Sequence, residues 1–288
     1  MKDNKKHKKA EYGILITGLI ILLAVACIIA LCAGQYSVSV PEVIKILASR
    51  FVNVTKTWSN TAEGVVFTLR LPRIIGAVLV GSALSLSGAA YQGVFKNPLV
   101  APDLLGVSSG ACVGASVAIL LHLNSFGVQA MAFVAGIWAV GLTLFIPRLI
   151  KNTNMTMLVL SGIIVKGIMD SVMGIIKYVA DPETELQSIT YWQLGSLTKV
   201  LPKDLFTVGP VIVAASVIIF LLRWRINILS LGDREAKTLG VSVTIVRNFI
   251  IICATLLTAS AVCISGTIGW IGLVIPHFAQ MLTGPDNT

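Results

Sequence analysis

Residues Leu69–Ala111 read LRLPRIIGAVLVGSALSLSGAAYQGVFKNPLVAPDLLGVSSGA and decide the fold class. The stretch contains the segment Arg-Leu-Pro-Arg, an apolar run rich in Gly, Ser and Ala, a polar turn at Lys96-Asn97-Pro98, and a second apolar run. Small residues inside apolar runs let helix backbones approach closely, which is typical of bundles of membrane helices. We therefore predict two tightly packed membrane helices joined by the polar turn.

The composition of the whole chain supports this prediction. Hydrophobic residues make up 56% of the 288 residues and charged residues 12%, whereas a soluble domain averages about 25% charged residues. The net charge of +9 comes from short connections between apolar runs and from five N-terminal lysines, a pattern that orients membrane proteins. No basic and aromatic platform accompanies it, so nucleic-acid binding is not predicted. The five cysteines show no metal-binding spacing, and the sequence implies no metal site and no cofactor.

Eight apolar runs have nearly the roughly 20 residues that a helix needs to cross a bilayer. The runs are 13–33, 71–91, 104–122, 129–147, 156–178, 205–222, 248–264 and 267–283. Because backbone groups in lipid need partners within their own segment, the runs predict an all-α polytopic membrane protein. We expect residues 1–12 to form a basic cytoplasmic N-terminus and residues 13–288 the transmembrane domain, beginning with an uncleaved first span.

The bias of Lys and Arg among the connections favours an N-terminus inside the cell. Two long connections then lie outside. The first, 34–68, begins with a helix-start signal around Pro41. The second, 179–204, contains Tyr191 and Trp192, which suit the interface between membrane and water.

Lys166 and Asp170 lie inside the fifth apolar run. They are four residues apart, so they share one helix face and can pair. A charge at the centre of a membrane helix costs about 2.5–3.5 kcal/mol on insertion scales, so such residues usually face protein or water. Two interpretations stay open: the residues line a translocation path, or they form a self-satisfied pair within the bundle.

The segment 106–110, GVSSG, matches the G-x-S-x-G pattern of serine hydrolases. That pattern needs a strand, a sharp turn and a helix, with His and Asp partners for the serine. Here it opens an apolar helix, and we interpret Gly106, Gly110 and Gly114 as one close-packing helix face. The chain has neither a P-loop nor an HExxH motif, so it does not bind a nucleotide in that way.

Residues 229–240, LSLGDREAKTLG, form the second unusual stretch. Four charged residues fall between positions 233 and 237 in a short, helical piece that Gly240 would end. The segment is either a solvated connection or a docking surface for a cytoplasmic partner.

Three separate stretches resemble one family, the FecCD-type permeases of ATP-binding-cassette (ABC) importers for iron–siderophores, haem and cobalamin. The motifs that carry the resemblance are Arg70-Leu-Pro-Arg73, Gly88, Gln92, Asn97-Pro98-Leu99-Val-Ala-Pro102 and Leu105-Gly106-Val-Ser-Ser-Gly110; Leu231-Gly232-Asp233 through Ala236 to Leu239-Gly240-Val241; and Ser265-Gly266-Thr-Ile-Gly269-Trp-Ile-Gly272-Leu-Val-Ile-Pro276-His277 with Gly284-Pro285-Asp286. Residues 181–197 fit as well, so the resemblance covers nearly the whole chain.

The resemblance implies the type II ABC importer permease fold. In that family two permease copies or paralogues form a dimer around a central path, ATPases bind from the cytoplasm, and a substrate-binding (lipo)protein docks from outside. By resemblance, Arg70 and Arg73 receive acidic residues of the binding protein, since Arg pairs well with carboxylates. The resemblance also places Lys166 and Asp170 on the wall of the path, although a lysine there departs from the family pattern. The residues it assigns to ATPase coupling are Leu231, Gly232, Asp233, Arg234, Glu235, Ala236, Leu239 and Gly240.

The family has ten spans, whereas this chain ends after its eighth apolar run, so we expect two spans to be absent. The sequence predicts a permease subunit, not itself an enzyme, in the cytoplasmic membrane of a prokaryote. It would import an iron–siderophore by alternating access, with haem and cobalamin as alternatives. A second hypothesis is a secondary transporter driven by an ion gradient and coupled through Lys166 and Asp170. A third is an intramembrane protease that uses Ser108.

Overall fold

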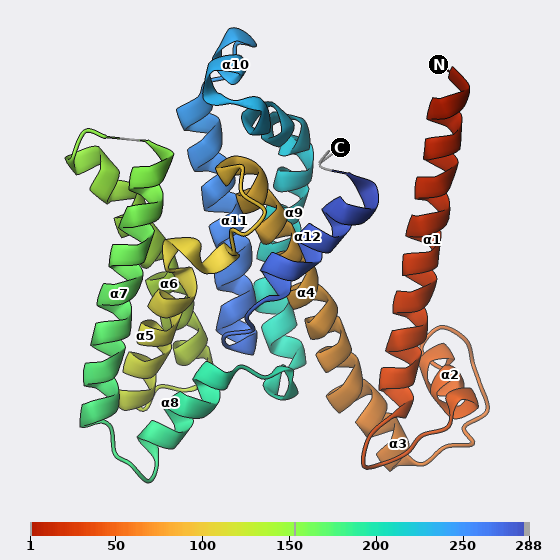
Figure 1. Ribbon diagram of the computed structural model, residues 1–288. Coiled ribbons are helices and arrows are strands. Elements are labelled where there is room, and N and C mark those ends of the chain that lie inside the picture. The colour runs from red at the N-terminus through yellow and green to blue at the C-terminus, as the bar shows by residue number, and fades with distance from the viewer. Residues whose placement is uncertain (1, 153, 285–288) are drawn as a thin grey trace. The chain divides into compact units, whose positions relative to one another are not determined.

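The computed structural model describes residues 2–152 and 154–284, with side chains described from Tyr12 onward. Every regular element in this part of the chain is helical, which confirms the predicted all-α class (Figure 1). The chain divides into two compact units, Met1–Ala77 and Val78–Thr288, and each is described by itself. The expected turn at Asp286-Asn287, and the side chains of the N-terminal lysines, lie outside the described residues.

The helices of the first unit are α1 (Lys2–Cys32), α2 (Val40–Ala48), α3 (Asn60–Gly64) and the π-helical η1 (Val65–Arg70), followed by the start of α4 (Leu71–Phe95). The second unit holds the rest of α4, η2 (Pro102–Leu105), α5 (Val107–Leu120), α6 (Ser125–Leu149), α7 (Met155–Val179), α8 (Glu185–Leu194), η3 (Leu197–Lys199), α9 (Pro202–Leu231), α10 (Asp233–Thr238), α11 (Val243–Ser265) and α12 (Ile271–Thr283). In Figure 1, α10 lies at one end of the second unit and α8 at the opposite end.

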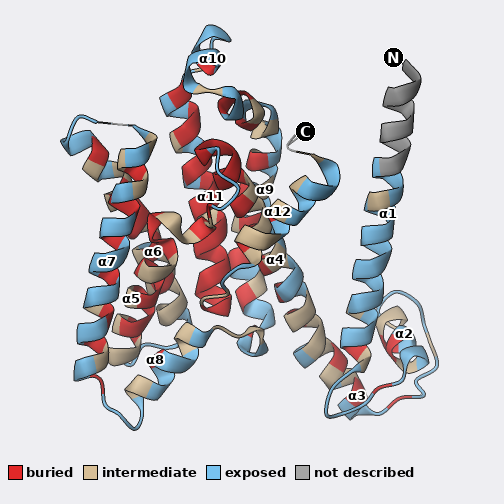
Figure 2. Ribbon diagram, viewed as in Figure 1, coloured by how far each residue is buried: buried red, intermediate tan, exposed pale blue. Residues whose placement is uncertain are grey.

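The first unit combines an exposed apolar helix with a small core. Most apolar side chains of α1 are exposed (Figure 2), as expected of a helix that faces lipid. The predicted short helix of the first long connection is α2, which begins after Ser39 with Pro41 in its first turn. It buries Val43 and Ile46 against a cluster that includes Trp58.

The number of membrane-length helices differs from the prediction. Six helices are long and apolar enough to cross a bilayer among the described residues, rather than eight. The runs 104–122 and 267–283 give only the shorter helices α5 and α12. The cause is local: Gly106 at φ 80° separates η2 from α5, and Trp270 at φ 69° immediately precedes α12. Left-handed backbone conformations of this kind end regular helices.

Helix α11 forms the centre of the second unit. Most of its residues are buried (Figure 2). Two hydroxyl contacts join it to α4: Ser87 Oγ lies 2.7 Å from Thr258 Oγ1, and Tyr91 Oη lies 3.1 Å from Thr255 Oγ1. Such hydrogen bonds stabilise helix pairs in the membrane.

The predicted glycine face is confirmed in part. A Cβ atom added to Gly110 or Gly114 would collide with Ala135 or Met131 of α6, so both glycines allow α5 and α6 to pack closely. Gly106 does not belong to this face. It lies before α5 in the left-handed conformation and packs against the backbone of Lys166 on α7.

Candidate functional site

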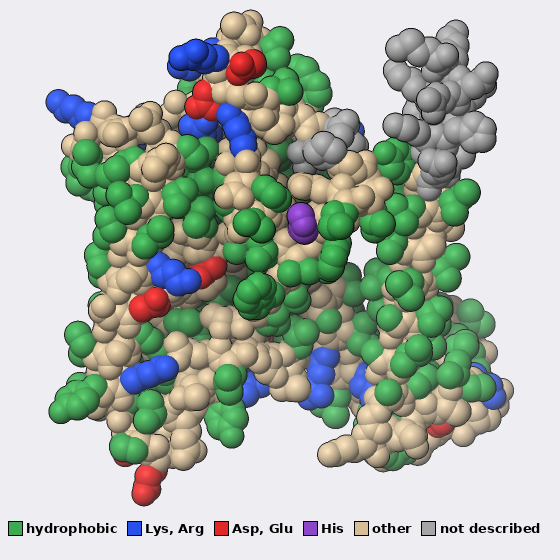
Figure 3. Space-filling model, in the orientation of Figure 1, with side chains coloured by type: hydrophobic (Ala, Val, Ile, Leu, Met, Phe, Trp, Pro, Cys, Tyr) green, Lys and Arg blue, Asp and Glu red, His purple; other side chains and the backbone are tan. Residues whose placement is uncertain are grey.

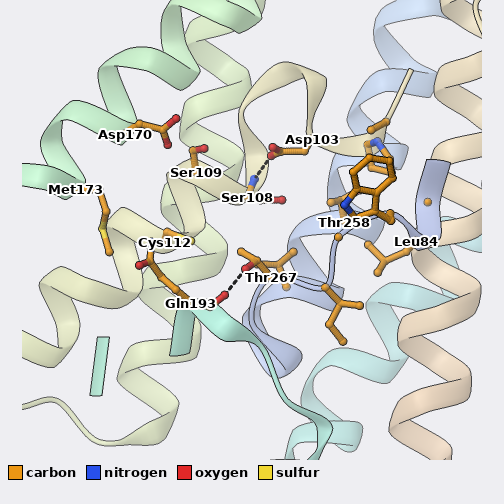
Figure 4. Close-up of a pocket in the computed structure, with 17 residues that line it drawn as sticks. Leu84, Asp103, Ser108, Ser109, Cys112, Asp170, Met173, Gln193, Thr258 and Thr267 are labelled. Atoms are coloured by element: carbon orange, nitrogen blue, oxygen red, sulfur yellow. Dashed lines mark hydrogen bonds between the residues drawn. The ribbon is translucent and has the colours of Figure 1, made fainter. Parts of the chain in front are cut away.

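A cavity of about 310 Å³ lies within the second unit, where η2 and the start of α5 lie near the segment that leads into α12. Polar side chains from five different elements surround it (Figure 4). These lining residues are Asp103 of η2, Ser108, Ser109 and Cys112 of α5, Asp170 of α7, Gln193 of α8, and Thr258 of α11. Apolar side chains complete the lining, and a space between membrane helices that also presents polar groups is the kind of place where a membrane protein handles a polar solute.

Asp103 connects two walls of this cavity. Its Oδ1 accepts the backbone N–H of Ser108 at 3.0 Å, which caps the start of α5. Its Oδ2 lies 2.8 Å from Nζ of Lys166 on α7. Thr143 Oγ1 of α6 donates to the carbonyl of Leu105 at 3.0 Å and fixes the η2 turn from the other side. The turn that carries Asp103 is therefore held by α5, α6 and α7 together.

The structure gives Lys166 a different partner from the one considered in the sequence. Its ammonium pairs with Asp103 rather than with Asp170, because the η2 turn brings Asp103 against α7. Asp170 lines the cavity one helical turn along α7. The two charged residues of the fifth run and Asp103 thus form one cluster, and blue and red side chains lie together midway along the second unit in Figure 3.

The end of α8 closes the cavity against the connection between α11 and α12. Thr267 Oγ1 donates to the carbonyl of Gln193 (Figure 4), and the backbone N–H of Ser196 donates to the carbonyl of Ser265 at 2.6 Å. Gly195 and Gly266 both have positive φ, and each lies directly against the other segment's backbone. Any side chain at these two positions would separate the segments.

A second backbone crossing joins α4, η2 and α12 beside the cavity. A Cβ atom on Gly272 would collide with Pro102 and with the carbonyl of Leu84, and one on Gly88 would collide with the carbonyl of Gly272. Gln92 Nε2 donates to the carbonyl of Leu273 at 3.0 Å. Motif residues that are far apart in the sequence therefore meet at one place.

A separate charged cluster lies at the α10 end of the second unit (Figure 3). Nη2 of Arg247, at the start of α11, lies 2.7 and 2.8 Å from the two carboxylate oxygens of Asp233. Nζ of Lys96, in the turn after α4, lies 3.3 Å from Asp233 Oδ1. The hydrogen bond from Arg247, followed by its charge and by Lys96, lowers the pKa of Asp233 below its usual value.

The predicted short helix between 229 and 240 is confirmed as α10. Gly240, at φ 76°, ends it: the Gly240 and Val241 N–H groups donate to the carbonyls of Lys237 and Ala236, both at 3.0 Å, which is the Schellman arrangement. Within this helix only Ala236 is buried. The predicted coupling residues that are exposed are Leu231, Asp233, Arg234, Glu235, Leu239 and Gly240.

The two arginines expected to dock a binding protein differ in their surroundings within the first unit. Nη1 of Arg70 donates to the carbonyls of Leu31 and Cys32 at 2.6 and 3.1 Å, and Nη2 donates to the carbonyl of Tyr36 at 2.5 Å. Arg70 therefore caps the C-terminal end of α1. Arg73 is half-exposed, and the structure shows no hydrogen bond from its guanidinium to a described residue.

The geometry does not assemble a serine protease around Ser108. Ser108 lies in the first turn of α5, whereas His122 follows the far end of that helix, where its Nε2 lies 3.5 Å from Glu185. Among the described residues there is also no group of three or more His, Cys, Asp or Glu side chains that could hold a metal ion.

Sequence reasoning missed three residues of these clusters: Asp103, Lys96 and Arg247. Asp103 had a signal, because an acidic residue just before a helix commonly caps it. Arg247 had one too, since a cation near a helix N-terminus is unfavourable without a nearby anion. Lys96 had none beyond its place in a polar turn.

Apolar helices around a cavity with polar lining residues, and a short charged helix at one end, are typical of a membrane transport protein. The model of the FecCD transport family matches residues 22–288. The chain belongs to this family, and like its relatives it is a permease subunit, a transport component rather than an enzyme.

Curated relatives and a solved structure agree with this assignment. A molybdate import system permease protein of Haemophilus influenzae is 36% identical, over 96% of this chain and 82% of its own length. A hemin transport system permease protein of Yersinia pestis is 34% identical, over 84% of this chain and 74% of its own length. A solved structure described as an inward-facing conformation of a metal-chelate type ABC transporter is 34% identical. It superposes with a TM-score of 0.85, covering 96% of this chain and 83% of that one. These relatives give no support to the hypotheses of an ion-driven transporter or a protease.

Proposed function

We propose that this chain is the permease of an ABC importer that carries an iron–siderophore across the cytoplasmic membrane of a prokaryote. The observation that carries the proposal is the family match over residues 22–288, together with the likeness to a metal-chelate type ABC transporter. Relatives whose names include iron chelatin support this cargo. The names of other relatives specify hemin, vitamin B12 or molybdate, and these are the competing cargoes.

The cavity supports a path that opens and closes. Its volume of about 310 Å³ is at the lower end of the roughly 300–1,000 Å³ of pockets for drug-sized ligands. A siderophore complex would therefore pass only when the surrounding helices move apart, as in alternating access between two states. Asp103, Lys166 and Asp170 would then form a charged part of the wall of this path.

The same proposal assigns the partners to surfaces. The exposed side of α10, with Arg234 and Glu235, and Leu239 directly after it would bind a cytoplasmic ATPase. Arg73, which keeps its guanidinium available, would receive an acidic residue of the extracytoplasmic binding protein, whereas Arg70 stabilises the end of α1. A second permease copy or paralogue would complete the path, and the N-terminus would lie in the cytoplasm.

The proposal can be tested by uptake in cells that express the chain together with an ABC ATPase and a binding protein from the same organism. The cargo probes are iron-55 ferrichrome, iron-55 haem, cobalt-57 cyanocobalamin and molybdenum-99 molybdate. We expect iron-55 ferrichrome to accumulate, ATP depletion to stop the accumulation, and an uncoupler at constant ATP to leave it unchanged. Uptake that follows the uncoupler instead of ATP would contradict an ABC importer, and uptake of another probe alone would replace the cargo.

A further inference from the structure

Asp233 joins the short helix α10 to two other elements of the second unit. Its carboxylate is held by two contacts of 2.7 and 2.8 Å to one nitrogen of Arg247 on α11, and by one of 3.3 Å to Lys96 in the turn after α4. Hydrogen bonds between ionised groups are stronger and more directional than those between neutral groups. We call the set of Lys96, Asp233 and Arg247 the α10 clamp.

The arginine of the clamp depends on Asp233. Arg247 lies in the first two turns of α11, where the helix dipole disfavours a positive charge. Its side chain is only 9% exposed, so water does little to solvate the guanidinium. A buried cation of this kind needs a paired anion, and Asp233 supplies it. The pair therefore fixes where α10 can sit relative to α11.

The six residues of α10 divide into two sides. Ala236 is fully buried in the main apolar core, and Asp233 is held by the clamp. Arg234, Glu235 and Lys237 are exposed, and no salt bridge of theirs to a described side chain is present. The helix thus has an internal side fixed to the permease and a charged external side free to meet a partner.

Two short routes lead from the clamp to the cavity. Asp103, which pairs with Lys166 on α7, is the seventh residue after Lys96. From Arg247, α11 continues for about three turns to Thr258, which lines the cavity. A displacement of α10 that preserves the clamp would therefore act on the base of α11 and on the segment that leads to Asp103.

We propose that Asp233 is a positioning residue that transmits movement of α10 to the walls of the cavity, rather than a residue that binds the ATPase. The proposal rests on the proposed function, since it assumes that an ATPase binds the external side of α10. It divides the predicted coupling segment into transmitting residues, Asp233 and Ala236, and partner-binding residues, Arg234 and Glu235. It adds Lys96 and Arg247, which the sequence motifs did not include.

The experiment measures movement at the cavity without any cargo. In a background lacking the five native cysteines, Ser109→Cys places a thiol in the cavity wall, and its labelling by a water-soluble methanethiosulfonate is followed in the complex with the ATPase. Tyr178 lies near the C-terminal end of α7 and is 90% exposed, so Tyr178→Cys reports any general change in reactivity. We expect ATP with vanadate to change the labelling rate of Ser109→Cys at least fivefold and that of Tyr178→Cys by less than 1.5-fold.

Adding Asp233→Asn should reduce the nucleotide effect at Ser109→Cys to less than 1.5-fold while the ATPase still co-purifies with an affinity within twofold of normal. Glu235→Ala should show the opposite pattern, lowering the affinity for the ATPase more than the nucleotide effect at Ser109→Cys. Lys96→Met, which removes only an exposed contact, should reduce the effect about twofold. Asp233→Glu, which can restore the pair with Arg247, should recover most of it.

Two results would overturn the proposal. A full nucleotide effect in Asp233→Asn would show that the clamp transmits nothing. An ATPase affinity that falls as far in Asp233→Asn as in Glu235→Ala would make Asp233 a partner contact. If instead the ATPase fails to co-purify with the unaltered chain, the proposed function itself is wrong, and this failure is distinguishable because it appears before any clamp variant is measured.

Discussion

The α10 clamp and the Asp103–Lys166 pair use the same ionic chemistry in opposite settings. In the clamp, an arginine side chain that is 9% exposed makes two contacts with a carboxylate that is 49% exposed. In the cavity, a single 2.8 Å contact joins side chains that are 46% and 31% exposed. Breaking the first leaves a charge without water, whereas breaking the second returns both charges to water.

This difference in exposure suits the two ionic contacts to different roles, one holding helices in place and the other changing during transport. Removing one member of a buried pair is strongly destabilising, because the remaining charge is uncompensated. Exposed pairs contribute only about 0–1 kcal/mol and can exchange partners readily. The clamp therefore suits a rigid joint, and the cavity pair suits a contact that changes as solute and water pass. The following predictions test this contrast.

The largest effect on stability is expected from Asp233→Ala. It leaves the buried guanidinium of Arg247 without its carboxylate, and hydrogen bonds to charged groups contribute about 1.5–3 kcal/mol each. We expect the free energy of unfolding in detergent micelles to fall by about 2 kcal/mol. Glu235→Ala, two residues along the same helix and exposed, should change it by less than about 0.5 kcal/mol. Equal losses for the two variants would show that the clamp is no more stabilising than a surface charge.

At the cavity, close backbone packing should contribute more to stability than the ion pair. Gly272→Ala adds a Cβ atom against Pro102 and the carbonyl of Leu84, and overpacking of this kind costs about 1–3 kcal/mol. Gly269→Ala, at a second glycine that lines the same cavity, meets no atom within 4 Å. We expect thermal unfolding to show a loss of about 1–2 kcal/mol for the first variant and little change for the second. A tolerated Gly272→Ala would mean that α4, η2 and α12 are not tightly packed there.

Protonation of Asp233 at low pH should lower the free energy of unfolding by no more than Asp233→Ala does. The folded-state pKa of Asp233 is lowered by Arg247, so its contribution to stability is fully present above the unfolded-state value of 3.8. That contribution is lost as the pH falls through the folded-state value, since protonation removes the anion. Unfolding measured from pH 7 to pH 2 should show a smaller acid loss in Asp233→Asn than in the unaltered chain. Parallel curves for the two proteins would mean that other carboxyl groups dominate the acid response.

The sequence predicted the helical class and the α10 helix, but not the ionic partners. The spacing of apolar residues and the positions of glycines report on local structure. They were therefore sufficient to identify the Gly110–Gly114 face and the end of α10 at Gly240. Asp170 was the one pairing partner that the sequence offered for Lys166, because the two share a helix face, whereas its partner Asp103 lies 63 residues away. A helical period says which face a residue occupies, and not which distant turn is folded against it. The left-handed Gly106 was misassigned to a helix for the same reason, since only the packing of η2 on α7 fixes its conformation.

The smallest change in stability is expected from Lys166→Met, which is also the variant that best separates the two regions. Both charges of the cavity pair are partly solvated, so the free energy of unfolding should change by less than about 1 kcal/mol. Lys177→Met, on the same helix, is the matched control: Lys166 pairs with Asp103 of the cavity lining, whereas Lys177 has no salt bridge to a described residue. If the pair lines the path, uptake of iron-55 ferrichrome should change at least threefold in Lys166→Met and remain within 1.5-fold of normal in Lys177→Met. Asp103→Asn is a poorer probe, because Asp103 also caps α5 and its loss would disturb the cavity wall itself. Normal uptake by a stable Lys166→Met protein would assign the pair to holding η2 against α7, and both ionic clusters would then serve positioning alone.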